Sequence, residues 1–219
     1  MARLAGMAKI VVFGAGGQSA RAFIQEASWR GHQVTGVVRD PDRYTDLDVP
    51  AVKGDAADAD AVADLAAKHD VALSAVNLPP DGPDSFYVDV TTALLDGLAR
   101  AGVGRLLLVG GAGSLEVAPG TRLMDLPDFP VAFQAGAHAH VRSLELLREV
   151  DTPVDWVYVS PAAYFDPAGQ RTGSYRIGAD QLLTNPEGDS HISYADFAIG
   201  LVDEIETPRF HRTRVTFAD

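Results

Sequence analysis

An apolar run that breaks into a cluster of small residues constrains this fold more than any other feature of the sequence. Residues 9–13 read Lys-Ile-Val-Val-Phe, and Gly14-Ala15-Gly16-Gly17-Gln18-Ser19-Ala20 follows directly. A buried strand that turns into a helix around a diphosphate has this pattern, because glycines allow a tight turn and a close approach of backbone N–H groups. The helix then directs its free N–H groups and its positive dipole end at the phosphates. We therefore expect Gly14, Gly16, Gly17, Gln18 and Ser19 to bind a dinucleotide.

The residues after this loop support a dinucleotide-binding unit and indicate which dinucleotide it takes. The expected helix ends at Gly31, and a second strand follows over 32–38. A carboxylate at the end of that strand would bind both ribose hydroxyls, whereas a guanidinium would bind a 2′-phosphate. Here the residue is Arg39, with Arg43 and Arg21 as secondary candidates. This order favours NADP(H) over NAD(H), although a solvated arginine at a strand end would leave NAD(H) as the alternative.

The rest of the chain continues the alternation of strands and helices. Further strands are expected at 49–53, 71–76, 105–109 and 154–159, and helices at 56–69, 85–100, 137–150 and 193–206. The pattern predicts one domain over 1–219 with a doubly wound Rossmann α/β fold. Its mainly parallel sheet has the order 3-2-1-4-5-6, closes with a seventh strand at 212–217 and carries helices on both faces. Residues 161–191 are irregular, with β-like pieces at 174–177 and 181–184, and are expected to form a small insertion on the substrate side.

Composition and charge exclude several classes of protein. With 47% apolar residues among 219, the chain can bury a full core. The net charge of -12 argues against nucleic-acid binding, and the absence of cysteine excludes disulfides and zinc–thiolate sites. No apolar run approaches bilayer length, and Met1 to Ala8 contains no hydrophobic segment of a secretion leader. These features predict a cytoplasmic protein without membrane partners and without a metal site.

Loops at the carboxyl ends of parallel strands should line one crevice. The sequence places unusual residues there: Asp55 and Ala56 after the third strand, Asn77, Leu78 and Pro79 after the fourth, Gly111 and Ser114 after the fifth, and Pro161 and Tyr164 after the sixth. We expect the first group near adenine, the second beneath the nicotinamide ribose, and the last two groups around the nicotinamide and the substrate. Each loop could instead be an ordinary tight turn.

Several segments resemble one known family. They are Gly14–Ala20, Val109–Val117, Pro127–Pro130, Ser160–Phe165, Gly173–Leu183 and Ile192–Ala198. Together they resemble the atypical short-chain dehydrogenases/reductases that bind NAD(P)H and are related to NmrA-like proteins and to the biliverdin-IXβ and flavin reductases. The first motif is shared by a very large superfamily, whereas the later ones are typical of this narrower group. The resemblance implies a reductase-like fold with bound NADP(H).

The chain lacks the catalytic pair of carbonyl-reducing relatives. That pair is a tyrosine four residues before a lysine, whose ammonium lowers the pKa of the phenol. The lysines here are Lys9, Lys53 and Lys68, and none has a tyrosine four residues before it. In the expected region Phe133 is followed four residues later by Ala137. Without this pair, the reaction that stays possible is hydride transfer to a planar acceptor such as a flavin or quinone, because it requires mainly positioning of the two reactants.

Other titratable and aromatic residues complete the set of candidates. His138 and His140 lie near the start of one expected helix on different faces, so one of them should face the crevice, where it is a candidate acid; a structural helix histidine is the alternative. Tyr164 and Tyr175 could stack on the substrate, and Ser114 offers a hydroxyl. The competing function is a non-catalytic, NmrA-like redox sensor; a nucleotide-sugar epimerase is less favoured because no proton-relaying group is found. The expected partner is a small-molecule acceptor, and both a monomer and a homodimer remain open.

Overall fold

A mainly parallel sheet forms the centre of the molecule. The computed structural model describes residues 6–79 and 82–219; the first residues of the Met1 to Ala8 segment lie outside this part. The sheet runs in the order β3-β2-β1-β4-β5-β8-β12-β10, and only β10 is antiparallel to its neighbour. The strands are β1 (Lys9–Phe13), β2 (Gln33–Val38), β3 (Ala51–Lys53), β4 (Val71–Ser74), β5 (Arg105–Val109), β8 (Asp155–Ser160), β10 (Arg176–Gly178) and β12 (Thr213–Ala218).

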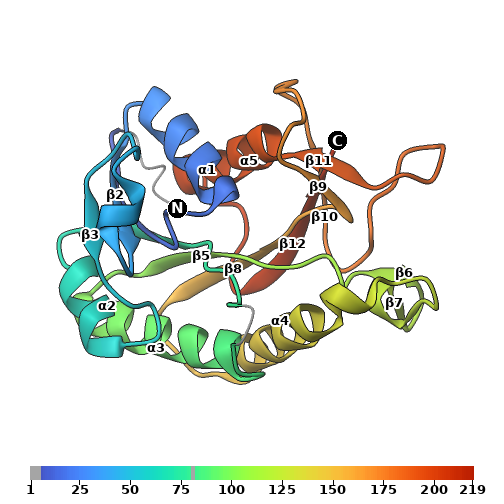
Figure 1. The fold of residues 1–219 in the computed structure, drawn as a ribbon, viewed down its shortest axis with the longest axis horizontal. Helices are drawn as coiled ribbons and strands as arrows, with labels where there is room; N and C mark the ends of the chain where they lie inside the picture. The colour runs from blue at the N-terminus through green and yellow to red at the C-terminus, as the bar shows by residue number, and fades with distance from the viewer. Residues whose placement is uncertain (1–5, 80–81) are drawn as a thin grey trace.

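Helices cover both faces of this sheet (Figure 1). One face carries α1 (Gln18–Trp29) and α5 (Tyr194–Glu206), and the other carries α2 (Ala59–Ala66), α3 (Phe86–Ala101) and α4 (Val131–Glu149). Short 3-10 helices, η1 (Pro41–Tyr44) and η2 (Leu123–Asp125), lie in the connections. This arrangement confirms the doubly wound Rossmann fold with helices on both sides of the sheet.

Burial of both sheet faces explains why the strands are continuous apolar runs. In β1, Ile10 and Val12 pack toward α1 and α5, whereas Val11 and Phe13 pack toward α2 and α3. Side chains alternate between the two faces of a strand, so a strand covered on both faces has no polar positions to reveal its period. The predicted order of the first six strands is confirmed, and β12 is the predicted closing strand.

The second half of the chain departs from the sequence predictions in two places. Helix α4 begins at Val131 rather than at Ala137. Its first turns are exposed, so they show no apolar stripe, and the stripe starts only where α4 meets the sheet. The β-like piece at 181–184 is not a strand and makes only an isolated bridge between Gln181 and Glu116. The piece at 174–177 corresponds to β10, which pairs with β12.

Four short strands were not predicted. A hairpin of β6 (Glu116–Ala118) and β7 (Thr121–Arg122) precedes α4, and β9 (Tyr164–Asp166) pairs with β11 (His191–Ser193) at the two ends of the insertion. Strands this short have too few residues to show an alternating pattern. No helix in the described part of the chain is long and apolar enough to cross a membrane.

Candidate functional site

The glycine loop between β1 and α1 has the geometry of an anion cradle. Gly14 has φ +81, and a Cβ there would lie 2.7 Å from the Ala75 carbonyl oxygen, so only glycine fits. The Gly14 and Ala15 amides donate to the Val37 carbonyl and close the turn. Gly17 caps α1 without any side-chain hydrogen bond to the first turn. The free N–H groups at the start of α1 are therefore open to a phosphate.

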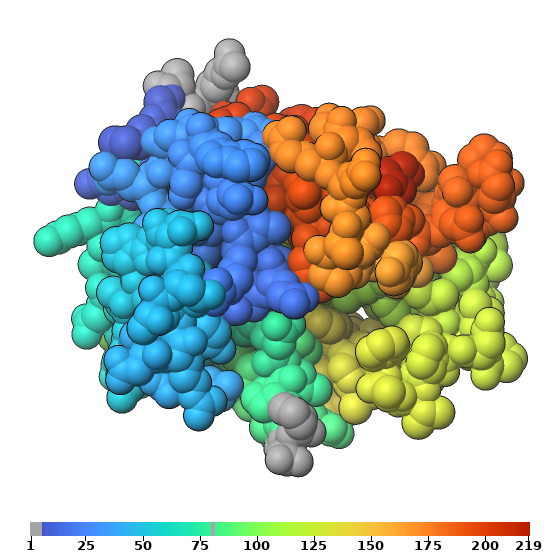
Figure 2. Space-filling view, turned by 45° about the horizontal axis from the view of Figure 1, so that its top comes forward, coloured from blue at the N-terminus to red at the C-terminus, as the bar shows by residue number. Residues whose placement is uncertain are grey.

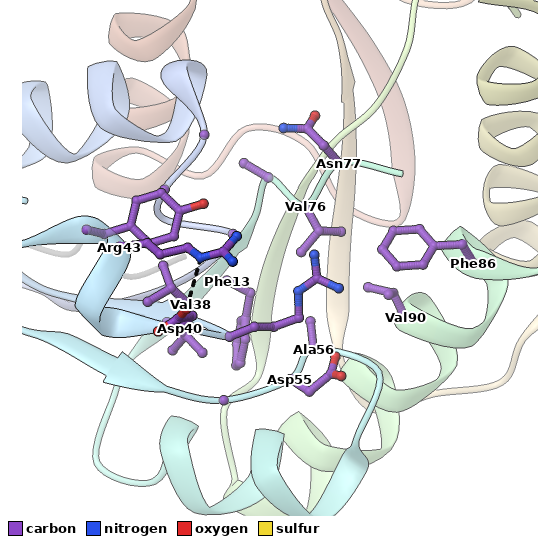
Figure 3. A pocket seen from close by; sticks show the side chains of 18 residues that line it. Phe13, Val38, Asp40, Arg43, Asp55, Ala56, Val76, Asn77, Phe86 and Val90 are labelled. Atoms are coloured by element: carbon purple, nitrogen blue, oxygen red, sulfur yellow. Dashed lines mark ion pairs between the residues drawn. The ribbon is translucent and has the colours of Figure 1, made fainter. Parts of the chain in front are cut away.

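Two connected pockets border this loop at the carboxyl ends of the strands. They share residues of the loop and of the segment after β4, namely Gly16, Gly17, Ala75, Val76 and Asn77. The first pocket, of about 250 Å³, lies over the ends of β2 and β3 (Figure 3). The second, of about 400 Å³, extends toward α4 and the insertion. In the space-filling view, orange residues of the insertion stand across a hollow from yellow residues of the hairpin and α4 (Figure 2).

The first pocket collects the residues expected around adenosine. Arg39, Asp55 and Ala56 line it, together with Arg43 and Tyr44. Figure 3 shows Arg43 paired with Asp40, at 3.0 Å between Nε and Oδ2. Arg39 forms no ion pair with any residue in the described ranges. Its guanidinium is therefore free to meet an anion.

Arg21 is committed elsewhere. Both of its terminal nitrogens donate to the Asp46 carboxylate, at 3.0 and 2.9 Å, and its Nε donates to the Gly16 carbonyl oxygen. The hydrogen bond with Asp46 raises the pKa of Arg21 and lowers that of Asp46. Arg21 thus braces the glycine loop, and it is not a free phosphate ligand as the sequence had suggested.

The second pocket has His140 in its wall and aromatic side chains opposite. Residues that line it beyond the shared segment are Gln18, Ser19, Val109, Gly110, His140, Phe165 and Tyr194. The Phe165 and Tyr194 rings lie 4.1 Å apart between centroids. None of the lining residues is an aspartate, glutamate, lysine or arginine. The pocket therefore suits an uncharged, flat group better than an ionic one.

His140 is held by two tyrosines. Its ring stacks on Tyr87 at 3.9 Å between centroids, and its Nδ1 lies 3.1 Å from the Tyr158 hydroxyl. Burial lowers the pKa of His140 from 6.5 to about 4, and burial raises the pKa of Tyr158. The imidazole is therefore neutral near pH 7 and the phenol keeps its proton. Because the alternative acceptor of that proton, the His140 carbonyl, is farther away at 3.4 Å, we assign the Tyr158 hydroxyl as donor to Nδ1 and the ring proton to Nε2.

The segment after β4 is anchored rather than free. The Leu78 amide donates to the Tyr87 hydroxyl at 3.0 Å, and the Pro79 carbonyl accepts from the Gly82 amide. Neither Leu78 nor Pro79 lines the two pockets, whereas Asn77 lines both. A Cβ on Gly17 would lie 3.2 Å from the Asn77 amide nitrogen, so the two segments are in close contact.

Besides Leu78 and Pro79, the structure places Ser114, His138, Tyr164 and Pro161 outside the groove. Ser114 accepts from Arg214, at 2.8 Å, and lines a separate pocket beside α4. His138 is exposed on another side of α4, and Tyr164 is 60% exposed and rests on His191. Pro161 is buried behind β8 and lines neither pocket. His138 and Tyr164 face away on α4 and β9, and Ser114 and Pro161 lie in loops that do not reach the two pockets; residue spacing alone reveals neither.

Gly110, Phe165 and Tyr194 line the second pocket, although they were not among the individual residues selected from the sequence. Gly110, and not Gly111, lines this pocket. Gly111 packs against the His140 ring, because a Cβ built on it would lie 2.9 Å from the His140 Cδ2. Phe165 and Tyr194 supply the rings that Tyr164 and Tyr175 were expected to supply. Phe165 follows Tyr164 directly on β9, and successive side chains of a strand face opposite sides. Without knowing that β9 exists, the choice between the two could not be made.

Comparison with known proteins decides the family. The model of a family described as NAD(P)H-binding matches residues 14–208. The chain belongs to the NAD(P)H-binding family. Among its relatives is the uncharacterized protein YwnB of Bacillus subtilis, which is 41% identical over 214 residues, covering 95% of this chain and 97% of YwnB. The match confirms the predicted resemblance to the NAD(P)H-binding, atypical short-chain dehydrogenases/reductases.

Solved structures match the fold over nearly the whole chain. A putative exported protein from Burkholderia pseudomallei is 43% identical with a TM-score of 0.87, covering 97% of this chain and 100% of that one. A putative NADH-flavin reductase from Streptococcus pneumoniae is 36% identical, also with a TM-score of 0.87, covering 97% and 99%. The cradle at Gly14, the uncapped start of α1 and the free Arg39 fit the NAD(P)H that the family binds.

Proposed function

We propose that this protein is an NADP(H)-dependent oxidoreductase that transfers hydride to a planar acceptor such as a flavin or a quinone. The observation that carries the proposal is the second pocket, which joins the glycine loop and has rings on one side and a neutral histidine on the other. An acceptor that takes its proton from solvent needs no acid from the protein. A pocket without ionised side chains is therefore compatible with such an acceptor.

Each part of the groove would hold one part of the reactants. Arg39 would bind the 2′-phosphate, and the start of α1 would bind the diphosphate. Gln18, Ser19 and Asn77 would orient the nicotinamide half, and Phe165 and Tyr194 would flank the acceptor. The dinucleotide, when bound, supplies the hydride. Holding the two reactants face to face lowers the activation barrier of hydride transfer, by about 7 kcal/mol or more when they are well oriented.

His140 would act as a hydrogen-bond donor and not as an acid. Its pKa of about 4 leaves it neutral near pH 7, so the ring lacks the second proton with which an imidazolium acts as an acid. Its Nε2 proton could donate to a ribose hydroxyl or to a carbonyl oxygen of the acceptor. The chain also has no Tyr-Lys pair that could protonate a carbonyl product. Phe133 and Ala137 occupy the positions where the pair is expected, and the Phe133 side chain is 64% exposed. Among the solved relatives, the S. pneumoniae protein is named as a putative NADH-flavin reductase, which supports a flavin as the acceptor, while the proposed preference for NADP(H) rests on Arg39.

Steady-state oxidation of NADPH with a panel of FMN, FAD, riboflavin and naphthoquinones tests the proposal. We expect at least one acceptor to accelerate NADPH loss above the protein-free rate. Phe165→Ala should weaken the response, because it removes a ring of the pocket, while Tyr164→Ala on the outward side of the same strand serves as the matched control. If no acceptor exceeds background, or if both variants behave alike, hydride transfer in this pocket is contradicted.

A redox sensor is the second candidate, because a pocket without ionised groups would also serve binding without turnover. A sensor must bind the oxidised and reduced forms with different affinity, since equal affinity shifts no equilibrium. Titration of the protein with NADP⁺ and with NADPH separates the two functions. Equal dissociation constants exclude a sensor, whereas a large difference without acceptor turnover favours it.

A further inference from the structure

Gly16 contacts an aromatic ring that the sequence does not place near it. A Cβ built on Gly16 would lie 2.3 Å from Cε1 and 2.4 Å from Cζ of Tyr44. Real Cβ atoms do not approach another atom this closely, so a side chain at position 16 would displace the Tyr44 ring from its place. The missing side chain of Gly16 thus makes room for Tyr44.

Tyr44 is held in this place by a local network. It is the last residue of η1, and its carbonyl accepts from the Leu47 amide. The Arg21 guanidinium lies 5.9 Å from the centroid of its ring, within the range of a cation–π contact. Arg21 in turn is fixed by Asp46 and by the Gly16 carbonyl. The ring, the guanidinium and the glycine loop therefore form one packed unit.

The Tyr44 ring also faces the dinucleotide groove. Tyr44 lines the first pocket together with Arg39 and Gly16, at the point where this pocket meets the glycine loop. Its ring is only partly buried, packed on one side against the core that includes α1. A ring that rests on the loop and opens into the adenosine side of the groove is in position to contact the bound molecule.

We propose that Tyr44 is a positioning residue for the adenosine half of the dinucleotide, and that the glycine at position 16 lets the Tyr44 ring rest on the loop. The ring forms a rigid wall beside the loop and limits where the adenosine ribose and its phosphate can lie. This differs from the expectation that Gly16 serves to bring its backbone to the diphosphate. The inference rests on the dinucleotide binding in the proposed function and not on hydride transfer.

A double-mutant cycle on the full chain tests the proposal through binding alone. NADPH dissociation constants are measured by titration calorimetry for Gly16→Ala, Tyr44→Ala, the double variant and Tyr44→Phe. We expect Gly16→Ala and Tyr44→Ala each to weaken binding about 10-fold, because the first displaces the ring and the second removes it. The double variant should bind no more weakly than Tyr44→Ala, because the added methyl group then meets no ring. Tyr44→Phe keeps the ring and should stay within about 3-fold of the wild type.

Gly136→Ala is the matched control, because a Cβ there meets nothing within 4 Å and the residue lies in α4 outside both pockets. It should leave NADPH binding unchanged. Competition by 2′,5′-ADP, which contains only the adenosine half, should be weakened by Tyr44→Ala as strongly as NADPH is. Thermal unfolding of each free variant verifies that it folds.

Two results would overturn the proposal. One is an equal loss from Gly16→Ala in the wild type and in the Tyr44→Ala background, which would assign Gly16 to the phosphate instead. The other is a Tyr44→Phe variant as weak as Tyr44→Ala, which would show that the ring is not the positioning element. Neither result depends on acceptor turnover, so a failure of the proposed hydride transfer would leave this test intact.

Discussion

Arg39 and Arg43 lie close together in sequence but have different surroundings. Arg43 is paired with Asp40, whereas Arg39 has no ion-pair partner among the residues of the described structure. A guanidinium without an internal partner breaks no ion pair when it binds a phosphate, so Arg39 is the better candidate for the 2′-phosphate. The sequence identified both arginines, and the structure separates them.

Arg39→Ala should weaken NADPH binding and leave NADH binding nearly unchanged, since only NADPH carries the extra phosphate. Charge-assisted hydrogen bonds contribute roughly 1.5–3 kcal/mol, so we expect a loss of about 10-fold or more. Arg43→Ala is the control and should cost less for both cofactors. Fluorescence titration with each dinucleotide measures the effect, and an equal loss for NADPH and NADH would remove Arg39 from this role.

His140 makes the stability of the protein depend on pH on the acid side. Its pKa falls from 6.5 to about 4 on folding, so below 6.5 the unfolded chain binds a proton that the folded chain does not. The stability from this residue is therefore present in full above pH 6.5 and is lost as the pH falls toward 4. With 1.36 kcal/mol for each pH unit, the loss reaches about 3 kcal/mol.

His140→Phe keeps the stacked ring on Tyr87 and removes the proton site, so this loss should be much smaller in the variant. Urea unfolding at about pH 5 and about pH 7 gives the difference for each protein. His138→Phe, on the exposed side of the same helix, is the matched control. A His140→Phe variant with the same pH dependence as the wild type would contradict the burial of the imidazole in its neutral form.

At the scale of elements, the start of α5 organises the insertion. Ser193 caps the helix by accepting from the Asp196 amide at 2.9 Å. The buried Asp196 carboxylate accepts from the Thr172 and Gly173 amides and from the Thr172 hydroxyl. One helix end thus holds a loop far from it in sequence. The Ser-x-x-Asp spacing predicts the start of the helix, but only the tertiary structure shows that the Asp196 carboxylate binds Thr172 and Gly173.

Ser193→Ala should destabilise the protein by about 1 kcal/mol through loss of this cap. The side chain is fully buried and the substitution leaves almost no cavity, so the hydrogen bond accounts for the change. Asp58→Ala at the exposed cap of α2 provides a comparison of similar size. The midpoint of urea unfolding measures both, and an unchanged midpoint for Ser193→Ala would contradict the assigned cap.

At the scale of the whole molecule, stability and binding are built at opposite ends of the sheet. Arg105 begins β5 and binds the Asp155 and Glu204 carboxylates, each at 2.6 Å, together with the Phe210 carbonyl. Glu204 is fully buried in α5. This cluster joins two strands to a helix at the amino ends of the strands, whereas the groove lies at their carboxyl ends.

Glu204→Ala should cost about 3 kcal/mol of stability, because it removes the buried carboxylate that Arg105 and two backbone amides bind and leaves Asp155 as the only carboxylate beside Arg105 among the described residues. The double variant Arg105→Met with Glu204→Leu should be more stable than this single variant, since it buries no unpaired charge. Cofactor affinity should be unchanged in any variant that folds. Chemical unfolding and NADPH titration measure the two effects, and weakened NADPH binding in the double variant would show that the two ends of the sheet are not independent.

The sequence by itself determined the strand and helix order and the glycine cradle, because both depend on local requirements. A strand buried on two faces must be apolar throughout, and a turn with positive φ at Gly14 requires glycine. It also found Arg39 and Asn77, since residues that end neighbouring parallel strands meet at one edge. The absence of the Tyr-Lys pair was equally readable from residue identities.

Only the tertiary structure decided which side chains meet. It seated Tyr44 on Gly16, enclosed His140 between Tyr87 and Tyr158, and turned Ser114 and Tyr164 away from the groove. These contacts join elements that are distant in sequence, and their geometry follows from how helices and loops pack on the sheet. Local sequence patterns do not contain this packing, so residue spacing predicted where the crevice lies but not all of the side chains that line it.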